Sequence, residues 1–129
     1  MYVGYFDEVK ADRTQGRNDY LVAGLIIPMD QVGAIEGQVT ALAEETFKSR
    51  ELVAETEFHA DHIYRGRENF KGKSLAERAA LLGKIAKFIG ENQYVSKVYA
   101  AIDSSRIYNP EQAAEFAFAH FVERVQMCV

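Results

Sequence analysis

The apolar run YLVAGLIIP, residues 20–28, constrains the fold of this chain more than any other segment. It contains no charged residue, yet it is far shorter than the roughly 20 apolar residues that a membrane-spanning helix needs. Such a run, closed by a proline, is typical of a strand that is buried on both faces of a sheet. Residues 2–6, YVGYF, have the β-branched and aromatic character of another strand. We therefore expect two adjacent strands that form a hairpin.

Two segments after this hairpin carry the periodicity and the end signals of helices. Asp30 can cap a helix over about residues 30–50. Ser74 and Glu77 have the spacing of a capping box, which opens a second helix that ends near Gly90. Apolar residues at helical spacing give each helix a buried stripe: Val32, Ile35, Val39, Leu42 and Phe47 in the first, and Leu75, Ala79, Leu82, Ile85 and Ile89 in the second.

A further strand and a further helix complete the pattern. Residues 94–102, YVSKVYAAI, are rich in β-branched and aromatic residues, and Asp103 marks the exit of this strand. Asn109 can then cap a helix whose first position is Pro110 and which runs toward Val129. Strands that alternate with helices predict an α/β fold. The chain has 129 residues, 48% of them apolar, which suffices for one domain with its own core.

The last predicted helix reaches Val129 without a capping glycine, a proline or a polar tail, and its final residues are mostly apolar. An α/β pattern would next supply a strand. We therefore expect residues 1–129 to form a domain that is truncated at its C-terminal end and lacks its last strand. The alternative is that a second copy of the chain covers the open edge, which predicts a homo-oligomer.

Composition argues against several classes of protein. A single cysteine, Cys128, cannot form an internal disulfide, and the N-terminus has no basic start followed by a long apolar run. We therefore predict a cytoplasmic protein with no membrane-spanning segment. The net charge of −4 argues against a surface that binds nucleic acid everywhere, because such binding depends on clustered lysine and arginine. A local basic patch is still compatible with this charge.

The first candidate site residues are Asp7 and Glu8, which directly follow the first predicted strand. Neighbouring strand residues point to opposite faces, so only one of the two can normally face a given site, and Asp7 is the better candidate. A carboxylate at a strand end can hold Mg²⁺, a hard cation that takes one or two protein carboxylates plus water and substrate oxygens. The alternative is an ordinary solvated turn.

The second candidate is the run EFHADH, residues 57–62, which places two of the three histidines and two carboxylates within six residues. In an extended chain Glu57, His59 and Asp61 would share one face, whereas a helix would spread the carboxylates apart. Such ligands suit Zn²⁺, Mn²⁺ or Mg²⁺, although the spacing matches no dedicated zinc motif. A histidine here could equally act as a general acid or base. The alternative is a polar loop with exposed histidines.

A locally basic segment follows, RGRENFKGK, residues 65–73. It has four basic side chains against one acidic side chain, and its two glycines predict a flexible loop. Such a loop can contact a nucleic-acid backbone whatever its base sequence, with Phe70 or Tyr64 available to stack on a base. The alternative is a plain solvated loop. The predicted phosphate contacts are Arg65, Arg67, Lys71 and Lys73.

Three motifs occur in order along the chain: YFDE at residues 5–8, LVAGLIIP at residues 21–28 and EFHADHIYRGRENF at residues 57–70. Together they resemble the domain-of-unknown-function 3800 family. The resemblance spans essentially the whole chain, and the EFHA run with the basic segment behind it is its most specific part. It implies a ribonuclease H-like fold, in which a mixed sheet is flanked by helices.

The resemblance also implies roles for particular residues. In that family the first strand typically ends in Asp-Glu-Ser-Gly, so Asp7 and Glu8 match, whereas the two residues after them depart from Ser-Gly. Glu57 and His59 match the second polar motif of the family, and the implied role is to complete a divalent-metal or catalytic centre with Asp7. A ribonuclease H-like site also needs an acidic residue on a late strand, and the chain ends before such a strand.

These residues lead us to expect a divalent-metal-dependent phosphodiesterase or nuclease that acts on nucleic acid. Mg²⁺ or Mn²⁺ would be held by Asp7, Glu8, Glu57 and His59, of which Asp7, Glu57 and His59 would be catalytic. A metal-bound water would be the nucleophile, His59 would assist proton transfer, and residues 65–73 would position phosphates. The competing hypothesis is a non-catalytic binding or assembly module of the same fold that oligomerises through its C-terminal edge.

Overall fold

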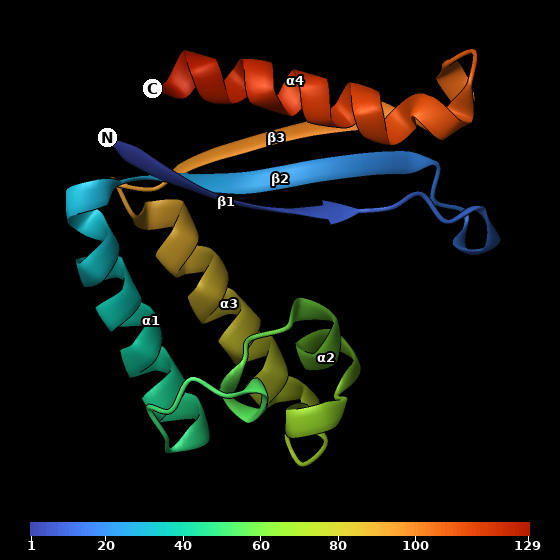
Figure 1. Ribbon diagram of the computed structural model, residues 1–129. Helices are drawn as coiled ribbons and strands as arrows, with labels where there is room; N and C mark the ends of the chain where they lie inside the picture. The colour runs from blue at the N-terminus through green and yellow to red at the C-terminus, as the bar shows by residue number, and fades with distance from the viewer. The chain divides into compact units, whose positions relative to one another are not determined.

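The computed structural model describes residues 1–129, and they divide into two compact units. Unit 1 consists of Met1–Asp30 and Gln93–Val129, and unit 2 of Gln31–Asn92. Unit 1 holds the three strands and one long helix, whereas unit 2 is built from the other three helices and short 3-10 turns (Figure 1). Each unit has a hydrophobic core of its own. That the whole chain forms one domain stays a prediction.

Unit 1 contains a three-stranded antiparallel sheet in the order β1-β2-β3. The strands span Tyr2–Val9 (β1), Asp19–Pro28 (β2) and Ser96–Asp103 (β3). β1 and β2 form the predicted hairpin, and the 3-10 turn Arg13–Gln15 lies between them. The three predicted strands and the α/β class are confirmed. Because all three strands are antiparallel, the mixed sheet that the resemblance implies is not present among them.

β1 continues past its predicted range to Val9, so the acidic pair lies inside the strand and not after it. Asp7 is paired with Ala23 of β2, and Glu8 with Val22. The long apolar strand β2 provides backbone hydrogen-bond partners as far as these two residues. This pairing outweighs the low β-propensity of acidic residues. Both carboxylates therefore lie on a strand and not in a turn, although both residues are exposed.

One face of the sheet is covered by α4, Ala113–Cys128 (Figure 1). Gly24 of β2 lies beneath this helix: a Cβ added there would stand 2.8 Å from Cζ of Phe121 and 2.7 Å from the carbonyl oxygen of Tyr5. Only a glycine allows so close an approach of the helix to the sheet. The core between them consists of Val22, Ile26, Val98, Ala100, Ala117 and Phe121.

Unit 2 contains α1, Val32–Phe47, α2, Ala60–Arg65, and α3, Leu75–Glu91. These helices enclose a small core with a buried centre. Neither they nor α4 is long and apolar enough to cross a membrane. The core consists of the buried Ile63, Phe70 and Leu81, with the partly buried Leu42, Phe47, Phe58, Leu82 and Ile85 packed around them.

The beginnings of α1 and α3 differ in how well they were predicted. The prediction that Asp30 caps α1 is wrong, because Asp30 lies in a 3-10 turn, Met29–Gln31, and the N-cap residue is Gln31. The capping box of α3 is confirmed. Glu77 N–H donates to Ser74 Oγ at 3.2 Å, and Ser74 N–H donates to Glu77 Oε2 at 2.7 Å. The latter bond lowers the pKa of Glu77, because it favours the ionised carboxylate.

Candidate functional site

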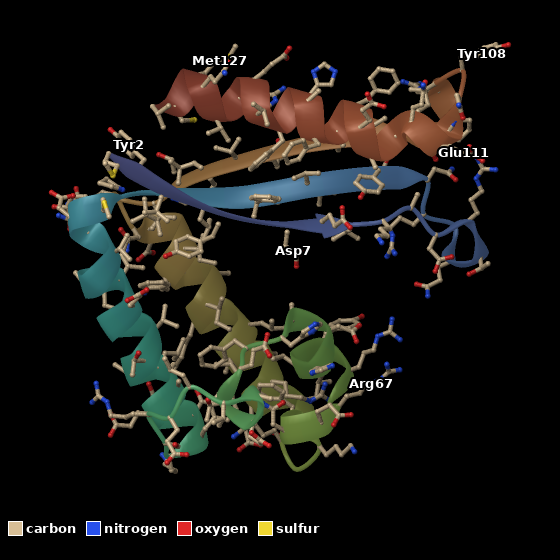
Figure 2. The ribbon with its side chains drawn as sticks, viewed as in Figure 1. Tyr2, Asp7, Arg67, Tyr108, Glu111 and Met127 are labelled. Carbon is tan, nitrogen blue, oxygen red and sulfur yellow. The ribbon has the colours of Figure 1, made fainter.

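Asp7 and Glu8 point to opposite faces of the sheet, as neighbouring strand residues must. Phe6 identifies the faces, because its ring contacts the rings of Phe118 and Phe121 on α4. Glu8 follows Phe6 by two residues and therefore lies on the side of α4. Asp7 projects from β1 away from α4 (Figure 2). On the face that α4 covers, the ligand candidate is thus Glu8, and the predicted preference for Asp7 can apply only to the other face.

An acidic recess of about 520 Å³ lies beside β1 and the first turn of α4. Glu8 and Glu115 line it together with Tyr20, and Asp7 borders it from the strand. No lysine or arginine lines it. Sequence reasoning missed Glu115, because one acidic residue in the first turn of a helix is common and favourable for electrostatic reasons alone. The remaining lining residues are Phe6, Val22, Ala114 and Phe118.

Two neighbours hold the Glu8 side chain in place. The Tyr20 hydroxyl donates a hydrogen bond to Glu8 Oε2, and Lys10 Nζ lies 3.6 Å from Glu8 Oε1. The hydrogen bond to Glu8 raises the pKa of Tyr20, because ionisation would break the bond and place a phenolate beside a carboxylate. The acidic recess therefore contains a carboxylate whose orientation is set by a phenol from the next strand.

This interaction predicts a late tyrosine titration. The pKa of Tyr20 is expected to lie above its ordinary value of 10.0, and Glu8→Ala should lower it toward that value. Since the raised pKa favours the neutral phenol in the folded state, its contribution to stability is full below pH 10.0 and is lost as the pH rises through the raised pKa. Ultraviolet difference titration of the seven tyrosines measures this, with Tyr20→Phe to identify the signal. An unchanged titration curve in Glu8→Ala would contradict the assignment.

In unit 2, Glu57 and His59 lie in extended backbone just before α2, with φ and ψ of −82° and 136° for Glu57 and of −103° and 113° for His59. Both line a recess of about 410 Å³, which we call the histidine recess. His62 also lines it, and its ring stacks on that of His59 with centroids 4.2 Å apart and planes inclined by 22°. The structure thus brings Glu57 and His59 to one recess, as we predicted for an extended backbone in this segment. The other lining residues are Ala54, Glu55, Glu68 and Asn69.

Asp61 does not share this face, because the chain is already helical at Asp61. Its carboxylate accepts a hydrogen bond from Arg65 Nε at 2.7 Å and lies 3.9 Å from Arg67 Nη1. Two of the four predicted phosphate contacts are therefore already paired with an acidic side chain. Lys71 and Lys73 form no ion pair. That these four residues bind nucleic acid stays a prediction.

The basic segment, residues 65–73, contains the end of α2 and a 3-10 turn where we predicted a loop, and its flexibility stays a prediction. Arg65 ends α2, Gly66 follows in the left-handed conformation at φ +65°, and a 3-10 turn ends at Phe70. The Phe70 side chain is completely buried, so the prediction that it can stack on a base is wrong. Tyr64 is 74% exposed and is the aromatic residue that can do so.

The four predicted metal ligands fall into different units: Asp7 and Glu8 in unit 1, Glu57 and His59 in unit 2. Their convergence on one ion stays a prediction. No group of three or more histidine, cysteine, aspartate or glutamate side chains is arranged to hold a metal ion. Glu8 and Glu115 nevertheless supply two carboxylates to one recess, and Mg²⁺ commonly takes one or two protein carboxylates with water and phosphate oxygens at its other positions. These donors fit a hard divalent cation that takes its other ligands from water or phosphate oxygens.

No protein-family model, curated protein or solved structure matches this chain. The resemblance described above therefore stays an expectation, and so does the ribonuclease H-like fold that it implies. The case for a function depends on the acidic recess of unit 1 and the histidine recess of unit 2.

Proposed function

We propose that the chain is a divalent-metal-dependent phosphodiesterase that acts on nucleic acid, with Mg²⁺ or Mn²⁺ as its metal. The observation that carries this proposal is the acidic recess, which Glu8 and Glu115 line together and Asp7 borders. Carboxylate oxygens are the protein ligands that these cations prefer. When bound, such a cation neutralises charge on a phosphate and acidifies a coordinated water, which together favour hydrolysis of a phosphodiester bond.

The side chains of the recess have separate roles in this proposal. Glu8 and Glu115 hold the cation, and Tyr20 keeps Glu8 in position through its hydrogen bond. The sequence-based hypothesis also names Asp7, which projects from the opposite face of the sheet (Figure 2), and Glu57 as ligands, and His59 as the group that donates or accepts a proton. In the histidine recess His59 stacks on His62, which restricts the orientation of its ring.

We also propose a ribonuclease H-like architecture for the chain. Its support is an α/β structure whose first strand carries the acidic pair that matches the family. A mixed sheet requires a parallel strand in addition to the three antiparallel ones. β1 is an edge strand that is hydrogen-bonded to β2 only, so its outer edge can accept such a strand.

The proposal predicts metal-dependent cleavage that Glu115→Gln slows strongly. Cleavage of single- and double-stranded DNA and RNA should require Mg²⁺ or Mn²⁺, and both Glu115→Gln and Glu8→Gln should lower its rate by roughly 100-fold, as expected for the loss of a group essential to a metal site. Glu123→Gln, on the exposed surface of α4 and outside the recess, is the matched control and should leave the rate unchanged. Cleavage that is equally fast in Glu115→Gln and the parent would overturn the proposed role of the acidic recess.

Whether Asp7 and Glu57 serve the same ion is tested by a double-mutant cycle. If both bind one cation, Asp7→Asn and Glu57→Gln should each weaken Mn²⁺ binding, and the double variant should lose little more than the worse single variant. Calorimetric titration with Mn²⁺ measures all three. Additive losses would show that the two carboxylates act independently, contrary to the sequence-based hypothesis.

The alternative function is a non-catalytic assembly module, and exposed apolar side chains favour it. Met127 on α4 is 84% exposed and Val129, just after the helix, is 61% exposed, and Tyr2 and Tyr5 are exposed on the edge strand β1. Unpaired strand edges and contiguous apolar patches are common sites of association. Light scattering over a range of concentrations discriminates: a concentration-dependent dimer without nuclease activity supports the module, and a strict monomer that cleaves nucleic acid contradicts it.

A further inference from the structure

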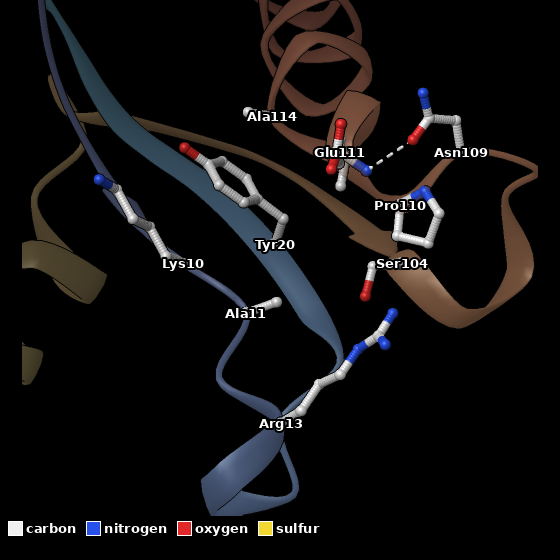
Figure 3. A pocket seen from close by; sticks show the side chains of 10 residues that line it. Lys10, Ala11, Arg13, Tyr20, Ser104, Asn109, Pro110, Glu111 and Ala114 are labelled. Atoms are coloured by element: carbon white, nitrogen blue, oxygen red, sulfur yellow. Dashed lines mark hydrogen bonds between the residues drawn. The ribbon is translucent and has the colours of Figure 1, made fainter.

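A second recess adjoins the acidic recess in unit 1 and has the opposite charge. It measures about 590 Å³, and Lys10 and Arg13 line it together with Ser104 (Figure 3). We call it the basic recess. The two recesses share Tyr20 and Ala114 as lining residues, so they are contiguous. The surface of unit 1 therefore changes from acidic to basic across the Tyr20 side chain.

Arg13 is the side chain of the basic recess that is most available to a ligand. Its guanidinium forms neither an ion pair nor a hydrogen bond within the chain, and it extends toward Ser104 in the recess (Figure 3). The turn that carries it is ordered, because Asp12 and Arg17 exchange two backbone hydrogen bonds of 2.8 and 2.9 Å. The backbone that carries Arg13 is therefore fixed before a ligand binds, and the five N–H donors of the guanidinium suit a phosphate.

The other polar groups of the basic recess define what it can bind. Lys10 adds a second cation, and Glu111 is the one acidic residue in the lining, so the lining is positive overall. Ser104 Oγ already donates to the Asn18 carbonyl at 2.7 Å, and the Glu111 amide donates to Asn109 Oδ1 at 3.1 Å. Lys10 and Arg13 are therefore the donors that an anion would meet.

We infer that the basic recess binds the phosphate group next to the scissile phosphate on a nucleic-acid strand. This inference rests on the proposed function, because it takes the acidic recess as the place of the scissile phosphate. A strand offers phosphates at regular intervals with a base beside each, and the two contiguous recesses with the Tyr20 ring between them match that arrangement. Arg13 binds the neighbouring phosphate through two N–H groups, and Lys10 neutralises part of its charge.

The test is the affinity of a short, fluorescently labelled single-stranded oligonucleotide, measured by anisotropy in the presence of a chelator. Without metal there is no cleavage, so binding is observed by itself. Arg13→Gln should weaken binding roughly tenfold, as expected for a lost charge-assisted contact, and should lower the salt dependence by about one counterion. Lys10→Gln should weaken it less, because Lys10 also lies near Glu8. Arg124→Gln, an exposed residue of α4 outside both recesses, removes the same charge and should change nothing.

The outcomes separate this inference from the proposed function. If Arg13→Gln binds the oligonucleotide as tightly as the parent, the inference is overturned, whether or not the parent cleaves nucleic acid. If Arg13→Gln weakens binding but the parent cleaves nothing with Mg²⁺ or Mn²⁺, the proposed function fails while phosphate binding in the basic recess stands. Calorimetric titration with inorganic phosphate tests whether the basic recess binds free phosphate and not a phosphate group of a nucleic-acid strand. Phosphate binding that Arg13→Gln removes, without any loss of oligonucleotide affinity, would assign the recess to free phosphate and overturn the inference.

Discussion

Phe70→Ala is expected to lower the free energy of unfolding by about 3–5 kcal/mol. The Phe70 side chain is completely buried among the helices of unit 2, beside Ile63 and Leu81. Its ring meets that of Phe47 edge-on, with 5.6 Å between the centroids. Removal of the ring leaves a cavity that the surrounding helices can fill only in part. Urea denaturation followed by far-ultraviolet circular dichroism measures the loss, because the chain has no tryptophan to report unfolding by fluorescence.

Tyr64→Ala is the matched control for this prediction. Tyr64 is 74% exposed, so its removal should change stability by no more than about 0.5 kcal/mol. If the basic segment contacts nucleic acid, Tyr64→Ala should weaken oligonucleotide binding more than Phe70→Ala does, because only Tyr64 is accessible to a base. Equal losses of stability in the two variants would show that Phe70 is not the centre of this core.

Gly24→Ala is expected to lower the free energy of unfolding by about 1–3 kcal/mol, the cost of overpacking a closely packed interface. The added Cβ would stand 2.7 Å from the carbonyl oxygen of Tyr5, and backbone cannot move aside as a side-chain tip can. It would also press on Phe121 and so displace α4. Because α4 carries Glu115, the same substitution should weaken Mn²⁺ binding in the acidic recess. Thermal and urea unfolding measure the first effect, and calorimetry the second.

Gly4→Ala provides the comparison on the neighbouring strand. A Cβ at Gly4 meets only Cδ1 of Ile26, at 3.2 Å, which is the mobile end of a side chain. Its effect on stability should therefore be smaller than that of Gly24→Ala. A Gly24→Ala variant as stable as the parent would mean that α4 does not pack on β2 as closely as the structure has it.

Local signals in the sequence predicted the elements of the fold well and their ends less well. The capping box at Ser74 is a short-range interaction, so spacing alone was enough to place the start of α3. The extension of β1 through Asp7 and Glu8 comes from pairing with β2, which no local pattern contains. The near-continuous apolar character of β2 predicted burial on both faces, but Ala23 is exposed. Composition cannot tell which alternate residues of such a strand a helix will cover.

The candidate site was predictable only where its geometry is local. Glu57 and His59 are two residues apart in extended backbone, so they share a recess as alternation requires. Asp61 departs from that alternation because α2 begins at the residue after His59. Glu115 is separated from Glu8 by most of the chain, and the two meet only because α4 packs back over the sheet. Such a pairing has no signal in a single sequence.

Calorimetric titration with Mn²⁺ tests the central claim most directly, because it asks whether the acidic recess holds a divalent cation. The parent chain is expected to show saturable binding, and both Glu8→Gln and Glu115→Gln should weaken it at least roughly tenfold while Glu123→Gln leaves it unchanged. Circular dichroism of each variant confirms that the fold is retained. Binding of equal strength in the parent, Glu8→Gln and Glu115→Gln, or no binding to the folded parent, would contradict the account.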